Sequence, residues 1–475
     1  MVPPRFGQWS TIHSPRSKQP FLCGHELAPS STRLTPVTDA SGESPAQLEA
    51  GRRGIEEMTR KSIEECRIQD DDTSKARGYE VSEMESVPLN PHEIPTDNPS
   101  AIYTTQPMGS SYPVECLLHS AAAKRELVEF PGYPLEIHRP SEVEERSYTI
   151  VDIPGKGLGM VATQDIEQGD LIASERPLLL APHGMCGFRD IWFEYEATQE
   201  EQQAAMFSEV ERVLRVAYDR MRPDDQAAYM KLHNAHLDDG SGPLLGILRT
   251  NVYSLFDMQG SKYTGVFNEL SRINHSCCPN ADRTFHRASL SMRLYAVRDI
   301  QKGEEITTSY CDLLAPFAKR QQYLARYGIH CECPPCLYPV ESDENRRRIS
   351  RLKNAVPAII KWAATPALRD DLLIVPALTI LRLLVGEGLE ATQHYTQALY
   401  HTMLIFAALG TEGDKIGYLC CIEEWARLRR WDAEGRNPAE KAKCDLEKVK
   451  VASRARRLLA AREGEGVVVD TPEVE

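Results

Sequence analysis

The sequence lacks the long hydrophobic runs of membrane-spanning proteins and the clustered basic residues of many nucleic-acid-binding proteins. Its most apolar stretch, residues 372–386, is interrupted by Pro376 and Arg382 and is too short to span a bilayer. Acidic residues outnumber lysine and arginine, which gives the 475 residues a net charge of −14. We therefore expect no membrane segment and no direct nucleic-acid binding through phosphate contacts. An acidic chain is better suited to a basic protein partner.

A complete set of paired cysteines and a signal peptide are also missing. The cysteine count is 13, an odd number, and the N-terminus has no apolar run resembling a signal peptide. This combination favours a reducing compartment, so we expect residence in the nucleus, the cytoplasm or both. There, clustered cysteines would serve as metal ligands and scattered ones as small core residues.

The composition divides the chain into four regions. Residues 1–133 are rich in proline, serine, threonine and charge, and are expected to be disordered apart from a short helix near 45–67. Residues 134–340 show strand patterns around a helical insert at about 188–236. Residues 341–463 read as helical hairpins separated by glycine and proline, and residues 464–475 as a disordered tail. The predicted fold class is α+β, with a mostly-β domain followed by an all-α region.

The predicted β domain contains an internal repeat. The pattern D-I-x-x-G-[DE]-x-I occurs at 165–172 and again at 299–306, and each copy reads as a strand end, a glycine turn and a second strand. The insert between them is helical, because the apolar residues of 206–217 fall on one helix face. Two similar hairpins on either side of a helical insert predict one discontinuous β domain.

A tight cysteine cluster predicts a metal site. Cys331, Cys333 and Cys336 form C-x-C-x2-C, and three thiolates on so short a loop converge readily on one tetrahedral Zn²⁺. The fourth ligand of a structural site is most naturally Cys277, with Cys278 and Cys311 as alternatives. If it is Cys277, zinc fastens the segment around 327–340 to a loop some 55 residues earlier.

Three further features carry polar or flexible groups. Asn274 and His275 stand side by side in a loop, Tyr310 ends the strand pattern E-I-T-T-S-Y, and a glycine-rich turn spans 155–159. Each has an ordinary structural explanation: a turn, a core tyrosine and a hairpin. The turn matches neither the phosphate-binding loop nor G-x-G-x-x-G, although its glycines permit close approach of a small ligand.

In combination and in this order, these motifs resemble a SET-domain protein lysine methyltransferase. The sequence shows G-K-G-L-G, then N-H-S-C-x-P-N, then G-E-E-I-x-x-x-Y-x-D, then the C-x-C-x2-C of a post-SET motif. The helical insert and helical C-terminal region are similar to the SET-and-MYND branch. The resemblance is strong over 145–340 and looser over 341–463. It implies transfer of a methyl group from S-adenosylmethionine to a protein lysine, histone or non-histone, by a monomer with a structural zinc ion.

The resemblance also assigns roles to individual residues. Tyr310 matches the tyrosine at the lysine channel, where it would position the amine, and Tyr253 and Tyr327 match aromatic residues that line this channel. The positions that match cofactor contacts are Lys156, Gly157, Leu158, Asn251, Ser271, Asn274, His275 and Ile329.

The sequence departs from the family pattern in two places. Residues 184–236 contain one cysteine, Cys186, so no MYND zinc module can form there. Ile329 stands where the family often has an aromatic residue that stacks on adenine, which predicts weaker cofactor binding. The alternative to an enzyme is a catalytically weak or inactive scaffold that binds partners through its helical C-terminal region. Retention of Asn274, His275 and Tyr310 together favours the enzyme.

Overall fold

The computed structural model describes residues 80–81, 86–88, 101–137, 146–183, 191–193, 196–365, 367–410, 421 and 445–453. The chain divides into two units, Met1–Gln69 and Asp70–Glu475, and every described residue belongs to the second. The helix expected near 45–67 and the tail at 464–475 lie outside the described residues. No helix in the described part of the chain is both long enough and apolar enough to cross a membrane.

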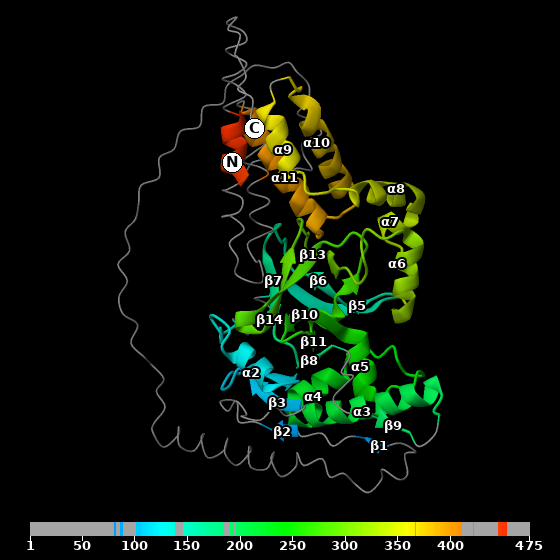
Figure 1. Ribbon diagram of the computed structural model, residues 1–475. Coiled ribbons are helices and arrows are strands. Elements are labelled where there is room, and N and C mark those ends of the chain that lie inside the picture. Colours follow the sequence, from blue (N-terminus) through cyan, green and yellow to red (C-terminus); the bar gives the residue numbers. More distant parts are fainter. Residues whose placement is uncertain are drawn as a thin grey trace, which may run out of the picture. The chain divides into compact units, whose positions relative to one another are not determined.

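The strands form four sheets (Figure 1). Their bounds are β1 Glu80–Val81, β2 Ser86–Pro88, β3 Ala101–Gln106, β4 Val114–Leu118, β5 Tyr148–Ile153, β6 Gly157–Ala162, β7 Leu171–Glu175, β8 Leu179–Pro182, β9 Ile191–Trp192, β10 Val252–Met258, β11 Ser261–Val266, β12 Asn274–His275, β13 Ala281–His286, β14 Ser291–Ala296 and β15 Glu305–Thr308. The sheet orders are β10-β11-β8-β4-β3-β2, β12-β15-β6-β5, β13-β14-β7 and β1-β9.

Helices occupy the insert and the C-terminal region. Their bounds are α2 Ala121–Val128, α3 Gln199–Arg220, α4 Pro223–Met230, α5 Pro243–Asn251, η4 Leu270–Arg272, η5 Arg287–Ser289, α6 Phe317–Leu324, η6 Ala325–Tyr327, α7 Pro334–Leu337, α8 Pro339–Ile349, α9 Val356–Ala364, α10 Asp371–Gly386 and α11 Gln393–Leu409. Residues 445–453 are also helical. The mixed fold, with β-rich and helical regions, confirms the predicted α+β class.

The six-stranded sheet separates two hydrophobic cores. On one face, Ile102, Cys116 and Leu180 join a core shared with the smaller sheets. On the other face, neighbouring residues such as Tyr103 and Leu117 pack against helices α3 and α5. A strand whose successive side chains enter two different cores shows no alternation of apolar and polar residues, and in β3 and β4 buried polar residues such as Thr104 and Glu115 obscure the pattern further.

This lack of alternation explains why one expectation is wrong. Residues 101–133 were expected to be disordered, yet they contain β3, β4 and α2, with both strands almost completely buried. Both strands are short, at six and five residues, and β4 finds its parallel partner far along the chain, where Cys116 pairs with Leu180. Neither length nor periodicity could reveal such strands, because both of their faces are buried and β4 also depends on pairing with the distant β8.

The sequence predicted that each copy of the D-I-x-x-G pattern forms a hairpin, and this prediction is wrong. Each copy instead connects two different sheets, β6 to β7 and β14 to β15. The two copies pair with each other: Ile166 and Ile300 exchange backbone hydrogen bonds of 2.8 and 2.9 Å. Asp165 accepts a hydrogen bond from the Lys302 N–H at 2.8 Å, and Asp299 accepts one from the Gln168 N–H at 2.9 Å. The repeat therefore joins the segments before and after the insert, which supports one discontinuous β domain.

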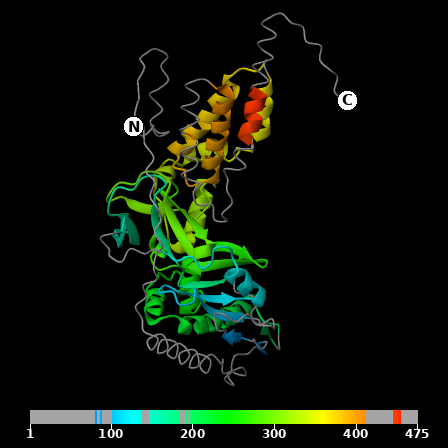
Figure 2. The same ribbon diagram turned by 90° about the vertical axis from the view of Figure 1, so that its left-hand side faces the viewer.

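The helices follow the predicted apolar faces. In α3, Val210, Val213, Leu214 and Ala217 are buried, and a capping box at Thr198 starts the helix. In the C-terminal region, α11 packs against both α9 and α10, and the three lie side by side in both views (Figures 1 and 2). Residues 411–420 and 422–444, where further helices were predicted, lie outside the described residues.

Candidate functional site

The loop that carries Asn274 and His275 is fastened to the strand that leads to Tyr310. These two residues form β12, which pairs in parallel with Thr307 and Thr308 of β15. At the far end of the loop, the Asn280 side-chain oxygen accepts a hydrogen bond from the Thr307 N–H at 2.8 Å. Asn280 therefore has the structural role expected of a turn residue, and it fixes the loop against β15.

Tyr310 is held by two hydrogen bonds to this loop. Its backbone N–H donates to His275 Nδ1 at 3.0 Å, and its hydroxyl donates to the Ile273 carbonyl at 2.5 Å. Burial raises the pKa of Tyr310 well above its ordinary value. The phenol therefore stays protonated across the physiological range, and can orient a reacting group but cannot act as a base.

His275 connects Tyr310 to the cysteine cluster. Because Nδ1 accepts the Tyr310 N–H, the proton of the neutral imidazole lies on Nε2. This nitrogen lies 3.2 Å from Cys277 Sγ, where it donates to the sulfur. The orientation of the ring is thus fixed from both sides.

Aromatic side chains surround Tyr310. The ring of Tyr327 meets it edge-on at 5.8 Å, and Tyr323 lies 6.1 Å beyond Tyr327. Burial also raises the pKa of Tyr327, to about 12. Tyr253 is buried and donates its hydroxyl proton to the Leu270 carbonyl at 2.7 Å. Apolar walls of this kind accommodate an alkyl chain and attract a cation.

The glycine-rich turn is connected to the Asn274 loop through Glu305, a residue for which no role was predicted from the sequence. Glu305 accepts hydrogen bonds from Lys156 Nζ at 2.6 Å and from Asn274 Nδ2 at 2.9 Å. The Asn274 amide also lies 3.4 Å from the Leu158 carbonyl. A Cβ atom at Gly159 would lie 2.8 Å from Asn274 Nδ2, so only glycine fits there. Glu305 belongs to the motif G-E-E-I, but the hydrogen-bond partners of its side chain were not evident from the sequence.

Other predicted cofactor residues make their hydrogen bonds elsewhere. Asn251 donates to the His233 and Ile247 carbonyls at 2.7 and 2.8 Å, and so closes the end of α5. Ser271 accepts the Phe267 N–H at 3.3 Å, and the Ile329 N–H donates to the Leu324 carbonyl. Gly157 has a φ of +72° and open space where a Cβ would be. The described contacts bring Lys156, Leu158, Asn274, His275 and Tyr310 together but do not join Asn251, Ser271 or Ile329 to them.

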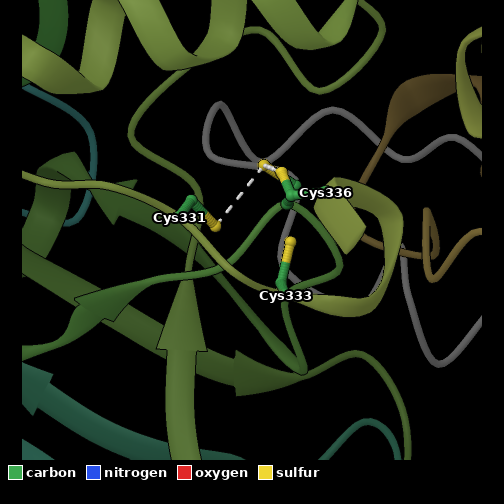
Figure 3. Close-up of side chains that lie close together, drawn as sticks. Cys331, Cys333 and Cys336 are labelled. Atoms are coloured by element: carbon green, nitrogen blue, oxygen red, sulfur yellow. Dashed lines mark hydrogen bonds between the residues drawn. The ribbon is translucent and has the colours of Figure 1, made fainter. Parts of the chain in front are cut away.

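Four cysteines converge as the motif predicted. The sulfur atoms of Cys277, Cys331, Cys333 and Cys336 all lie within 4.8 Å of one another, and Figure 3 shows the last three around a common space. Cys277 Sγ is 3.9 Å from Cys331 Sγ and 3.6 Å from Cys336 Sγ. Zinc–sulfur bonds of about 2.3 Å in a tetrahedron place sulfur atoms about 3.8 Å apart. The donor set therefore fits a tetrahedral thiolate-bound metal.

The two alternative ligands lie beside this group. Cys311 forms a second cluster with His275 and Cys277. However, the His275 Nε2 proton points at Cys277, which leaves no lone pair for a metal there. Cys278 Sγ lies 3.4 Å from Ser276 Oγ. The geometry favours Cys277 as the fourth ligand.

Two buried arginines lie next to the cysteines, and neither role was predicted from the sequence. Arg320 is fully buried and lies 3.9 Å from Cys336 Sγ. Arg346 is also fully buried, and donates to the Cys277 carbonyl at 3.1 Å and to Glu387 Oε2 at 3.2 Å. Four thiolates around Zn²⁺ would leave two negative charges, which nearby guanidinium groups stabilise.

Comparisons with known proteins agree with this geometry. The family model described as "SET domain" matches residues 157–311, a range that contains the end of the glycine turn, the Asn274 loop and Tyr310. Histone-lysine N-methyltransferase set5 of Schizosaccharomyces pombe is 32% identical over 213 residues, which are 44% of this chain and 56% of that protein. N-lysine methyltransferase SMYD2 of Gallus gallus is 31% identical over 30% of this chain and 34% of that protein.

A shorter match reaches higher identity. Histone-lysine N-methyltransferase ATXR2 of Arabidopsis thaliana is 44% identical over 77 residues, which are 16% of each chain. The chain spans from about one sixth to just over half of the length of these relatives. The protein carries a SET domain and is related to the SET-domain lysine methyltransferases. Within that group it is similar, at about 30% identity, to set5 and SMYD2 of the SET-and-MYND-like branch.

Proposed function

We propose that the protein transfers the methyl group of S-adenosylmethionine to the side-chain amine of a lysine in another protein. The observation that carries the proposal is the arrangement around Tyr310. A protonated phenol, aromatic walls and the Asn274–His275 loop lie together, and the glycine turn is fastened to the same loop by Glu305.

The residues near the glycine turn fit a nucleoside with an amino-acid tail. The turn offers open backbone at Gly155 and Gly157, and Asn274 and Glu305 lie next to it with a polar amide and a carboxylate. When bound, S-adenosylmethionine supplies a methyl group on a sulfonium, which is transferred in line to a neutral amine. Lys156, Leu158, Asn274 and His275 are the residues proposed to hold it, together with Asn251, Ser271 and Ile329.

The chain's own contribution to the reaction is alignment. Tyr253 and Tyr327 would confine the lysine stem, so that the amine approaches along one direction. The Tyr310 hydroxyl accepts a hydrogen bond from the amine, or a weak C–H···O contact from the methyl carbon, while it donates its own proton to Ile273. Because the phenol stays protonated, the amine must lose its proton by other means, of which desolvation is one.

The four cysteines are proposed to bind one structural Zn²⁺. The ion would fasten the segment after Tyr327 to the Cys277 loop, and so keep one wall of the lysine site in place. In this role zinc takes no part in methyl transfer.

The relatives guide the choice of substrate. The printed names of set5 and ATXR2 describe histone-lysine methyltransferases, and that of SMYD2 an N-lysine methyltransferase. We propose histones as the first candidates, and accordingly a nuclear location, shared with the cytoplasm if other proteins are also methylated. Microscopy of a fluorescent fusion tests the location, and sedimentation tests the proposed monomer.

Incubation with labelled S-adenosylmethionine and separate basic proteins, core histones first, tests the activity. Wild type should label at least one protein, and Tyr310→Phe should label it at least ten-fold more slowly, because a positioning hydroxyl is lost. Tyr338→Phe, at a tyrosine that is 71% exposed, is the matched control and should behave as wild type. Equal rates for wild type and Tyr310→Phe would exclude the role of Tyr310. If the protein binds no S-adenosylmethionine in calorimetry, the scaffold hypothesis replaces the enzyme.

A further inference from the structure

A positively charged side chain stands where the core pattern of strand β13 calls for an apolar one. Along Ala281–His286, alternate residues face the same side, and Ala281 and Phe285 are buried in the main core. Arg283 lies between them and faces the same way. A guanidinium in that position is costly to desolvate unless something specific holds it there.

What holds Arg283 is the proposed lysine site. Its Cζ lies 4.7 Å from the centre of the Tyr253 ring, within cation–π distance. One of its terminal nitrogens donates to the carbonyl of Ser309, the residue before Tyr310, at 3.1 Å. Among the described residues, these are its side-chain contacts, and no carboxylate forms an ion pair with it. Its charge also lowers the pKa of both Tyr253 and Tyr310, against the larger effect of burial.

In the described part of the chain, none of the carboxylates near this space forms an ion pair with Arg283, although the charge of Glu175 raises the pKa of Tyr253. Glu175 accepts hydrogen bonds from the backbone N–H groups of residues 268–270. Glu305 binds Lys156 and Asn274, and burial raises the pKa of Asp282, which disfavours its charged form. The other titratable groups around the site are the imidazole of His275 and the phenols of Tyr253, Tyr310, Tyr323 and Tyr327. Arg283 therefore places a positive charge against the Tyr253 ring without a carboxylate paired to it.

We propose that Arg283 is a specificity-determining residue of the lysine site, where its fixed positive charge excludes the protonated amine and admits the neutral one. The inference rests on the proposed function, because it concerns the amine that this site would bind. Arg283 occupies the face of Tyr253 that would otherwise attract an ammonium ion. Removing the charge should let the site bind a cation more tightly and should make methyl transfer depend on higher pH.

Sinefungin tests the charge without a protein substrate. This analogue of S-adenosylmethionine carries an ammonium group in place of the methyl sulfonium, whereas S-adenosylhomocysteine carries neither. Calorimetry at pH 7 gives the ratio of their affinities. Arg283→Leu should increase the preference for sinefungin by on the order of ten-fold, as expected for like charges separated by one aromatic ring, and Arg283→Lys should leave it near the wild-type value.

Arg287→Leu is the matched control. Arg287 also lies over aromatic rings, those of Phe130 and Phe256, but it pairs with Glu126 at 2.9 Å. Its loss should not change the affinity ratio. An unchanged ratio in Arg283→Leu would overturn the inference even if the protein is an active methyltransferase. If wild type binds neither compound, the proposed function fails as well, so the two failures are distinguishable.

Kinetics provide an independent measurement. With a protein that wild type methylates, the acid limb of kcat, which reports the pKa of the bound amine, should move upward by about one pH unit in Arg283→Leu, because the amine regains its affinity for a proton. Arg283→Lys should retain the wild-type limb. A purely structural role would lower the rate of both variants without moving the limb.

Discussion

Replacing Arg346 by methionine should strongly destabilise the contact between the cysteine cluster and the C-terminal helices. The Arg346 guanidinium is fully buried, and donates to the carbonyls of Cys277 and Leu313 and to the carboxylate of Glu387. Methionine fills a similar length but offers no donor. Glu387 is 8% exposed and would keep its hydrogen bonds from Ser342 and Asn345 but lose its cationic partner, and breaking a buried ion pair on one side costs about 3–5 kcal/mol.

Chemical denaturation followed by circular dichroism measures this effect. Arg346→Met should lower the free energy of unfolding by about 3–5 kcal/mol. Arg347→Met is the matched control, because the neighbouring arginine is 62% exposed and pairs with Glu344 on the surface. It should change stability by less than about 0.5 kcal/mol.

The double variant Arg346→Met with Glu387→Met separates the charge from the packing. If the unpaired carboxylate is the main cost, removing it should recover much of the loss, since a buried ion pair replaced by apolar groups is often neutral. A single Arg346→Met protein within about 1 kcal/mol of wild type would refute the reasoning, because a buried ion pair broken on one side should cost more.

Three further changes test the metal site, the glycine turn and a buried histidine. Cys333→Ser should reduce bound zinc from about one ion per chain to well below one by metal analysis, and full zinc content would exclude this ligand. Gly159→Ala should weaken S-adenosylmethionine binding by on the order of ten-fold in calorimetry, because its Cβ displaces Asn274, whereas Gly386→Ala, with open space around it, should not. Burial lowers the pKa of His401 to about 4, and its ring accepts the Ala355 N–H. The unfolded chain therefore binds this proton more readily, so stability should fall as pH decreases from about 6.5 to about 4, and His401→Leu should flatten that part of the profile.

The part of the site that local motifs define was predictable from the sequence. Cys331, Cys333 and Cys336 are close in sequence, and Tyr310 follows a recognisable strand, so their spacing carries the information. The order of the motifs also predicted the SET domain before any geometry was known.

The remainder depends on pairings between distant residues. Arg346 meets Cys277 across 69 positions, and β4 pairs with β8, so no local pattern contains either contact. The role of Arg283 is not predictable from the sequence for a different reason. Its position in β13 reads as solvent-facing when the residue is charged, and only the structure shows that this face of the strand is inward.

The paired D-I-x-x-G segments have a consequence for how the insert can vary. They join the chain before the insert to the chain after it through Asp165, Asp299 and the Ile166–Ile300 bridge, at a point away from helices α3, α4 and α5. The hydrogen bonds that hold the two copies together thus come from the repeat itself and not from the helices of the insert. A change in the length of the insert would leave these bonds in place, and with them the pairing of the segments that precede β7 and β15.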